Sequence, residues 1–551
     1  MEKQLKKETE INEHEAWKNS MYSWNASIPY VITTRNAEEL ARLGEIAPFL
    51  QGRLAFMKYP EFQTYMNLEN ITEIFKENPQ RGTNMAAKHE IGHRFCPFDL
   101  ITSIILMHKT KKGLEEKTRA YDTTQASKLV LNLCSDMNIN TLLVRKGDED
   151  IPWAYGILCR NKKDKLWKVY GKSMELAWKK ELLPKGTKLN KEESEAAENL
   201  AGLFEKDYFD RSKWPDSFQR YAEIIGDFLE EEKDGKGKKG KGDGKGGNGG
   251  IDDITGNIPK ELDDKTATEL AKRLAKIGSD GLPSNPKGME EFKEIMAGFG
   301  QGDMKKASIN FYEMLSRSYD VMFATKPFGR PRQSPFQPVK WQPSMGADKI
   351  DMEYSTALGG KIIPGVTTYT WNTRKREIHG GLEEVVPNLD LYLDSSMSTP
   401  NPLNEISLLV LAGFVAAKKA QKKGSRLRAT NFSGENQHFT QEWTTDLGLI
   451  YEALVKYYNG GTIFPTEKML EDGDPKQVLI ITDTFLANRD KTVSAVSELI
   501  KRHPGNRVSV YALHPVDDAD YLRNAGAEVI HGTNTDVFKK VIGKAHEVYT
   551  K

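Results

Sequence analysis

The strongest constraint on the fold of this chain lies after Asn388, where short apolar segments alternate with longer amphipathic segments. Each apolar segment has the length of a strand, and the segment that follows it has the spacing of a helix. The expected strands are 389–393, 426–432, 477–482, 507–512 and 527–530, and the expected helices are 404–422, 445–458, 488–502, 518–524 and 534–549. Because parallel strands need helical crossovers, this alternation predicts an α/β domain built on a doubly wound sheet.

The chain has 551 residues, which is too many for a single hydrophobic core, so we expect several domains. Between Glu230 and Gly250 a run rich in Gly and Lys contains no apolar residue, which predicts a flexible linker. A basic arm that grips phosphate or an acidic partner is the alternative interpretation of this run. We divide the chain into a mainly helical α+β domain (1–229), a linker (230–257), a helical segment with an extended connector (258–345) and the α/β domain (346–551).

Apolar spacings near three and four predict helices in the first domain and after the linker. The expected helices are Ala37–Phe49, Thr83–Phe95, Phe98–His108, Thr123–Asn138, Glu192–Phe204, Lys260–Ile277 and Met289–Met322. A short strand is expected at Trp167–Tyr170 and a hairpin strand at Lys361–Trp371. Residues 327–343 are rich in Pro and aromatic residues, which predicts an extended connector.

Bulk properties exclude several classes of function. The net charge is +1, so no global field attracts nucleic acid or an anionic membrane, and we expect neither as a partner. The longest apolar runs, Leu100–Met107 and Ile406–Ala417, are shorter than the ~20 residues of a spanning helix. Three sparse cysteines and a first segment without an apolar signal core lead us to expect a cytoplasmic protein. Without a Walker-type phosphate loop, any ATP-driven work must come from a partner.

Oxygen-bearing side chains follow two of the expected strands. Asp394, Ser396 and Ser398 form an Asp-x-Ser-x-Ser motif after the first strand, Thr462 follows Gly460-Gly461, and Asp483 follows strand 477–482. In a doubly wound sheet, loops at the carboxyl ends of strands meet near the switch in strand order. An all-oxygen set of ligands suits a hard cation, so we expect a Mg²⁺ site here.

These motifs resemble the metal-ion-dependent adhesion site of von Willebrand factor A (vWA) domains. The resemblance implies that Ser396, Ser398 and Thr462 touch Mg²⁺ directly, while Asp394 and Asp483 act largely through bound water. It also implies an open coordination position that accepts a carboxylate from a partner protein. Met397 and Thr484 depart from the small residue and the Gly that are usual at these positions. Crowding of the open face, or a vestigial site, is the alternative.

A different metal signature lies upstream, in His89-Glu90-Ile91-Gly92-His93. A helix brings positions i and i+4 to one face, so His89 and His93 can share one zinc ion. Glu90 is then placed to act as the general base of a hydrolase. The alternative is two histidines on a solvated helix.

A hydrolytic zinc site needs a third protein ligand. Our first choice is Asp136, on an expected amphipathic helix, which resembles the arrangement of gluzincins and aspzincins. The alternative is Asp99, six residues after His93 as in metzincin-like enzymes, although Cys96 replaces the usual Gly. We interpret Cys96 and Cys134 as buried thiols, with metal binding as the alternative.

The combination of an HExxH motif with a C-terminal vWA-like domain resembles a family of bacterial and archaeal proteins with a zincin-like metallopeptidase domain. The resemblance covers residues 75–145 and 340–550 and implies association with a MoxR-type AAA+ ATPase. We therefore expect a zinc metallopeptidase with a protein or peptide substrate, whose Mg²⁺ site docks a partner. The alternative is a non-enzymatic adaptor, with a structural zinc site, that recruits an AAA+ ATPase to client proteins.

Overall fold

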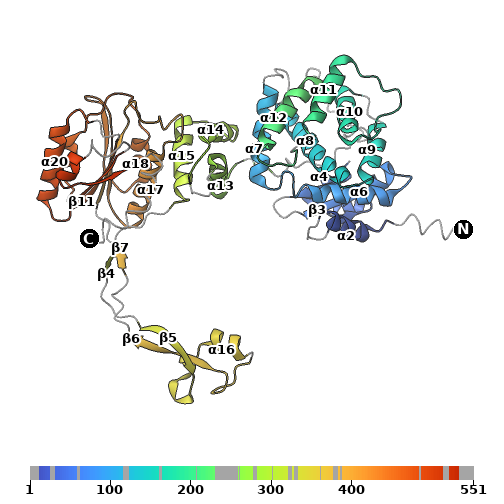
Figure 1. Ribbon diagram of the computed structural model, residues 1–551. Helices are drawn as coiled ribbons and strands as arrows, with labels where there is room; N and C mark the ends of the chain where they lie inside the picture. Colours follow the sequence, from blue (N-terminus) through green and yellow to red (C-terminus); the bar gives the residue numbers. More distant parts are fainter. Residues whose placement is uncertain are drawn as a thin grey trace. The chain divides into compact units, whose positions relative to one another are not determined.

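The computed structural model divides the chain into two compact units, Met1–Asp263 and Asp264–Lys551, which we call the N-terminal and C-terminal units (Figure 1). The described residues are 11–24, 31–51, 53–58, 63–115, 123–160, 164–205, 208–229, 258–259, 261–276, 282–300, 302–319, 325–327, 333–359, 361–375, 382–384, 388–473, 475–482, 486–512 and 520–532. The expected linker, Asp483 with Thr484, and the expected helix 534–549 lie outside them.

The N-terminal unit is mainly helical, as predicted, and adds a small sheet. Its helices are α2 (Glu13–Trp24), α3 (Ala37–Ala41), α4 (Ala47–Leu50), α5 (Leu68–Ile74), α6 (Pro79–Gly92), α7 (Leu100–Glu115), α8 (Thr123–Arg145), α9 (Asp150–Arg160), α10 (Lys165–Trp178), α11 (Lys191–Gly202) and α12 (Trp214–Ile225). Strands β1 (Ile32–Thr34), β3 (Gln63–Asn67) and β2 (Ala55–Lys58) pair in that order, which we did not predict. One large apolar core joins the longer helices of this unit.

Two local predictions for this unit were wrong. Residues 167–170 belong to α10, where Asp164 caps the Trp167 amide and the buried Leu166, Val169 and Met174 follow helical spacing. The expected helix 37–49 is broken into α3, a 3-10 turn and α4, because Gly44 takes a positive φ of 57° between them. Short apolar runs do not distinguish strand from helix, and glycine ends helices that the apolar spacing would continue.

The C-terminal unit contains the predicted α/β domain (Figure 1). Its six-stranded sheet has the order β10-β9-β8-β11-β12-β13. The strands are β8 (Asn388–Asp394), β9 (Leu427–Phe432), β10 (His438–Thr444), β11 (Lys476–Thr482), β12 (Arg507–Ala512) and β13 (Glu528–His531). All neighbours are parallel except β9 and β10. Because the chain leaves β8 toward β9 and later returns to β11 on the other side, the strand order switches between β8 and β11.

Helices cover both faces of this sheet (Figure 1). They are α17 (Leu408–Lys422), α18 (Leu447–Leu454), α19 (Thr466–Leu470), α20 (Arg489–Arg502) and α21 (Asp520–Asn524). The expected alternation is therefore confirmed, with helices 404–422 and 445–458 shorter than expected. The antiparallel edge strand β10 was not predicted, because none of its residues is buried and it carries no apolar run.

The C-terminal unit begins with helices α13 (Asp264–Ala275), α14 (Gly288–Gly298) and α15 (Met304–Ser316). The prediction of one helix over 289–322 was wrong, because Gly300 takes a positive φ of 81° between α14 and α15. Helix α15 packs on α17, where the rings of Tyr312 and Phe414 lie 5.3 Å apart.

The expected connector 327–343 is partly a strand. Its segment β5 (Gln333–Lys340) pairs antiparallel with β6 (Tyr369–Lys375), and β4 (Thr325–Pro327) pairs with β7 (Leu382–Glu384). Between β5 and β6 lies a small folded tip with α16 (Met352–Gly359), where the Trp371 indole donates to Asp351 Oδ2 at 2.7 Å.

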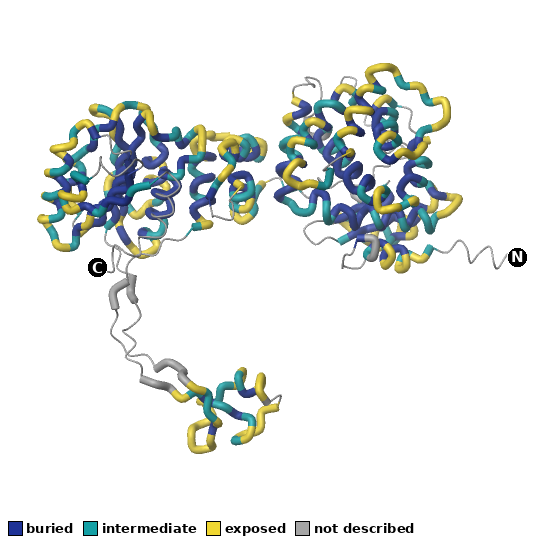
Figure 2. Tube along the Cα trace, in the orientation of Figure 1, coloured by how far each residue is buried: buried dark blue, intermediate teal, exposed yellow. Residues whose placement is uncertain are grey.

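Many residues of the tip are exposed (Figure 2). Eleven large apolar side chains are exposed in the described part of the chain, and six of them lie in the tip. These six are Met345, Met352, Leu358, Ile362, Ile363 and Val366.

Within the described ranges, no helix is both long enough and apolar enough to cross a bilayer.

Candidate metal centres

The first candidate site lies where α6 packs against α8 in the N-terminal unit. Helix α6 starts with Pro79, and the Asn78 side chain before it caps the Arg81 amide. The helix carries His89 and Glu90 in its last turn, and His93 is its C-cap. The Nε2 atoms of the two histidines are 3.1 Å apart. Asp136 Oδ1, from α8, lies 3.4 Å from His89 Nε2 and 3.6 Å from His93 Nε2.

These separations match the edges of a zinc coordination tetrahedron. With bonds of about 2.0–2.1 Å and tetrahedral angles, ligand atoms lie roughly 3.3 Å apart. Among the described residues, His89, His93 and Asp136 form a group whose ligand atoms lie within 4.8 Å of one another. Two imidazoles and a carboxylate are a common zinc ligand set, so the side chains fit the ion in both chemistry and spacing.

The other ring nitrogens of the histidines face acceptors. His89 Nδ1 lies 2.9 Å from Asn140 Oδ1, and His93 Nδ1 lies 3.1 Å from the Cys96 carbonyl oxygen. With Asn140 Nδ2 donating to the Tyr155 hydroxyl at 2.8 Å, the amide oxygen is the atom turned to His89. Both rings therefore carry their proton on Nδ1 and offer the Nε2 lone pair to a metal.

Asn140 is a functional residue that our sequence reasoning missed. It follows Asp136 by four residues and so lies on the same face of α8. That spacing could have identified it, because a ligating histidine needs an acceptor for its other nitrogen.

The other candidate metal ligands, Asp99, Cys96 and Cys134, are less suited to hold the ion through their side chains. Asp99 is not in the group of converging ligand atoms, and its Oδ1 accepts from the Thr102 amide at 2.7 Å at the start of α7. Burial raises the pKa of the Cys96 thiol to about 12 and also raises that of Cys134, which disfavours the thiolate that a metal would bind. Cys96 contributes its backbone carbonyl to the site.

A set of ion pairs holds the motif helix against α9. Lys88 Nζ lies 2.5 Å from Asp148 Oδ2 and 2.9 Å from Asp150 Oδ2, and Arg81 Nε donates to Asp150 Oδ1 at 2.8 Å. Burial alone would raise the pKa of Asp150, but the bonds to Lys88 and Arg81 lower it. The Trp24 indole also donates to the Lys88 carbonyl at 2.6 Å. The backbone immediately before His89 is therefore fixed from two sides.

The second candidate site lies at the carboxyl ends of β8 and β11, where the strand order switches. Asp394 ends β8, and its Oδ1 accepts from the Ser396 amide at 2.9 Å. Its Oδ2 accepts from the hydroxyl of Thr482, the last residue of β11, at 2.7 Å. The hydroxyl oxygens of Ser396 and Ser398 are 3.0 Å apart. The Asp-x-Ser-x-Ser motif thus turns its oxygen atoms toward one place.

The glycine loop lies beside this motif. Gly460 forms a parallel bridge with Ser396, and its carbonyl accepts from the Met397 amide at 3.1 Å. A Cβ atom on Gly460 would approach Gln437 Oε1 to 2.1 Å and Ser433 Oγ to 2.9 Å, so a larger residue would require these side chains to shift. Thr462 follows in the same loop and is buried. Four of the five predicted oxygen ligands therefore lie in two contacting loops, and Asp483 lies outside the described residues.

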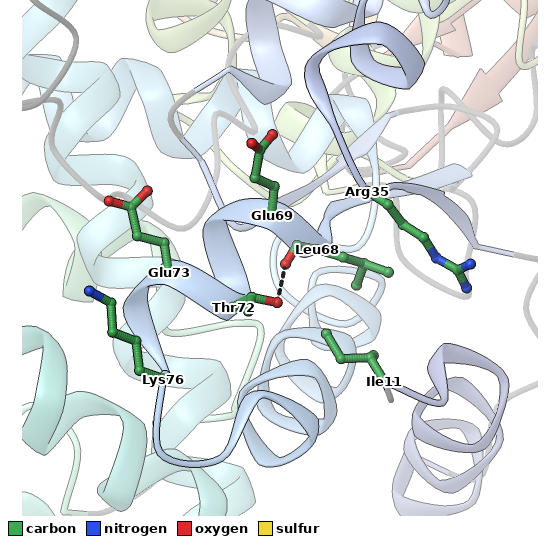
Figure 3. A pocket seen from close by; sticks show the side chains of 7 residues that line it. All are labelled: Ile11, Arg35, Leu68, Glu69, Thr72, Glu73 and Lys76. Atoms are coloured by element: carbon green, nitrogen blue, oxygen red, sulfur yellow. Dashed lines mark hydrogen bonds between the residues drawn. The ribbon is translucent and has the colours of Figure 1, made fainter. Parts of the chain in front are cut away.

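A hollow of about 700 Å³ lies beside α5, and its lining residues belong to neither metal motif (Figure 3). Arg35 and Lys76 lie at its two ends, Glu69 and Glu73 extend from α5, and Leu68 and Ile11 supply apolar surface. The mixture of charges selects no particular ligand.

Comparison with known proteins returned no matching family model, no curated protein and no solved structure.

Proposed function

We propose that this protein is a zinc-dependent, peptidase-type hydrolase that docks a protein partner through a Mg²⁺ site. The observation that carries the first part is the convergence of His89, His93 and Asp136, with Glu90 next to a ligand on the same helix. The proposal includes the finer fold assignments, zincin-like for the N-terminal unit and vWA-like for the sheet domain.

When bound, zinc would supply Lewis-acid activation of water and of a peptide carbonyl. The Glu90 carboxylate is the base that accepts the proton of the attacking water, and it returns that proton to the leaving nitrogen as the C–N bond breaks. His89 and His93 keep their Nε2 atoms available because Asn140 and the Cys96 carbonyl hold the Nδ1 protons. Asp136 supplies the negative charge that two neutral imidazoles lack.

Burial of the site supports a second candidate function. His89, Glu90 and His93 are fully buried and Asp136 nearly so, so a peptide reaches them only after local opening. A closed site is typical of structural zinc. In that case the protein is a non-enzymatic adaptor. Glu90 favours the hydrolase, because a structural site does not use a buried carboxylate beside its ligands.

Unlike the buried zinc site, the proposed Mg²⁺ docking site is open to solvent. Ser398 and Met397 are exposed, and Met397 keeps 75% of its surface. A hard cation held by hydroxyls retains coordination positions for water or for a partner's carboxylate. The partner that we propose is a MoxR-type AAA+ ATPase. Because the sequence has no Walker-type phosphate loop, any ATP-driven work would need an external ATPase.

Substitution of Glu90 by Gln separates the two candidates. Glu90→Gln keeps the shape and leaves the three zinc ligands in place, so it should retain about one zinc per chain. Its cleavage of fluorescently labelled casein should fall at least ~100-fold, as expected for loss of a general base. The matched control is Glu69→Gln, an exposed residue of α5, which should cleave like the wild type. Equal cleavage by Glu90→Gln and the wild type would exclude the hydrolase.

Docking is tested with Asp394→Ala. This variant should lose Mg²⁺-dependent binding to a purified MoxR-type ATPase, while its zinc content stays unchanged. Binding that persists in EDTA would show that the metal does not bridge the two proteins.

A further inference from the structure

Helices α13–α15 carry no recognisable motif, yet two of their side chains contact the loop that follows the Asp-x-Ser-x-Ser motif. The buried Tyr312 hydroxyl, from α15, accepts from the Ser407 amide at 2.8 Å and donates to the Glu405 carbonyl at 3.0 Å. Lys293, from α14, donates through Nζ to the Leu403 carbonyl. Three backbone groups within five residues are therefore held by side chains from elsewhere in the sequence.

Separate hydrogen bonds order the turn of this loop and the end of the motif that precedes it. The Leu403 amide donates to Asn401 Oδ1 at 3.0 Å, and the Glu405 amide donates to the Asn401 carbonyl at 3.1 Å. Before this turn, the Thr399 hydroxyl donates to the Ser396 carbonyl at 2.8 Å. The turn at 401–405 is therefore compact and begins two residues after Thr399.

The far end of the loop is fixed as well. Ser407 is the N-cap of α17, and its Oγ accepts from the Val410 amide. On the motif side, the Tyr457 hydroxyl contacts the carbonyls of Ser396 and Thr399 at 3.2 and 2.9 Å. Tyr312 and Lys293 add bonds from α15 and α14 to the loop backbone at Leu403, Glu405 and Ser407.

We propose that α14 and α15 form a brace that positions the Mg²⁺-binding hydroxyls, with Tyr312 and Lys293 as positioning residues. This inference rests on the Mg²⁺ site of the proposed function and gives the helices before the sheet domain a role in it. A tyrosine hydroxyl that both donates to and accepts from the backbone fixes the loop in one conformation, because either partner left unbonded in a buried place is costly.

The test compares two buried tyrosines that pack on the same phenylalanine. The Tyr312 ring lies 5.3 Å from Phe414, and the Tyr451 ring stacks on Phe414 at 4.0 Å. Only the Tyr312 hydroxyl bonds to the 403–407 backbone among the contacts described for these two residues. Tyr312→Phe and Tyr451→Phe in the full chain therefore remove equivalent hydroxyls from the same packing region.

Amide hydrogen exchange is measured first, without added Mg²⁺, on peptides covering 394–400 and 401–407. Tyr312→Phe should speed exchange in both segments by at least about fivefold, whereas Tyr451→Phe should change neither. Faster exchange confined to 401–407 would overturn the brace, because the motif itself would then be held independently of α15.

Mg²⁺ affinity is measured next by calorimetric titration. Tyr312→Phe should bind Mg²⁺ roughly tenfold more weakly than Tyr451→Phe, and Lys293→Met should also weaken binding. Unchanged affinity in both Tyr312→Phe and Lys293→Met would contradict the proposal. A wild-type chain that binds no Mg²⁺ would overturn the proposed docking function, while the exchange result would still decide whether α15 positions the loop.

Discussion

The two candidate metal sites differ in ligand chemistry, in supporting structure and in access. In the N-terminal unit, two imidazoles from the C-terminal end of α6 and a carboxylate from α8 lie between packed helices and are closed to solvent. In the C-terminal unit, hydroxyls and a carboxylate stand at strand ends, and Ser398 and Met397 reach the surface.

In the proposed function, this difference corresponds to two uses of metal in one chain. A buried nitrogen-rich site has rigid ligands with fixed protons, which favours tight and slow binding of zinc. An open all-oxygen site leaves part of the coordination shell to water, which favours weak and fast binding of Mg²⁺. In the proposed function, the first site retains its ion and the second shares its ion with a partner.

The largest expected contrast between the two sites is in the rate at which each releases its metal ion. If opening of the helical site costs ~4 kcal/mol, EDTA should remove zinc about 1000-fold more slowly than it removes Mg²⁺. Zinc release is followed with a chromogenic chelator, and Mg²⁺ release by stopped-flow fluorescence of an indicator dye. Zinc that leaves as fast as Mg²⁺ would contradict the closed site and remove the main argument for the adaptor.

The next effect concerns the third zinc ligand. Asp136→Asn replaces a charged ligand by a neutral amide, so zinc affinity should fall at least ~100-fold in a chelator competition assay. The matched control is Asp99→Asn, because Asn is as good an N-cap as Asp and should preserve α7. Comparable loss of zinc in both variants would show that the geometry has not identified the ligand.

A smaller loss of zinc affinity is expected when Asn140 is changed, because Asn140 contacts the ligand His89 and not the metal position itself. Asn140→Leu removes the acceptor of the His89 Nδ1 proton and should weaken zinc binding ~10–100-fold. Asn140→Asp keeps an acceptor and should restore affinity to the wild-type level or above. Equal zinc affinity in Asn140→Leu and the wild type, measured by the same competition assay, would mean that His89 needs no orienting partner.

The smallest loss of metal affinity is expected at the Mg²⁺ site of the C-terminal unit. Ser398→Ala removes one hydroxyl that water can replace, so Mg²⁺ affinity should fall only about three- to tenfold in calorimetric titration. Ser395→Ala is the matched control, because its hydroxyl donates to the Phe432 carbonyl at 3.0 Å. A loss as large as that of zinc in Asp136→Asn would mean that the two sites hold their ions in similar ways.

Periodicity was enough to predict the sheet domain and the motif helix, since strand–helix alternation and the i, i+4 histidines are local properties of the sequence. Asp136 required a guess about which helix packs on α6, and the structure brings α8 there. Asn140 was missed because its role appears only when His89 has been placed. Edge strand β10 was missed because pairing with β9, and not burial, makes it a strand.

The exposed apolar tip between β5 and β6 has a practical consequence for handling the protein. Six uncovered aliphatic or thioether side chains on one small lobe raise the tendency of the purified chain to self-associate as its concentration rises. Light scattering should therefore detect less clustering at low millimolar salt than at high sulfate, and polar replacements at Ile363 and Val366 should extend the working concentration range.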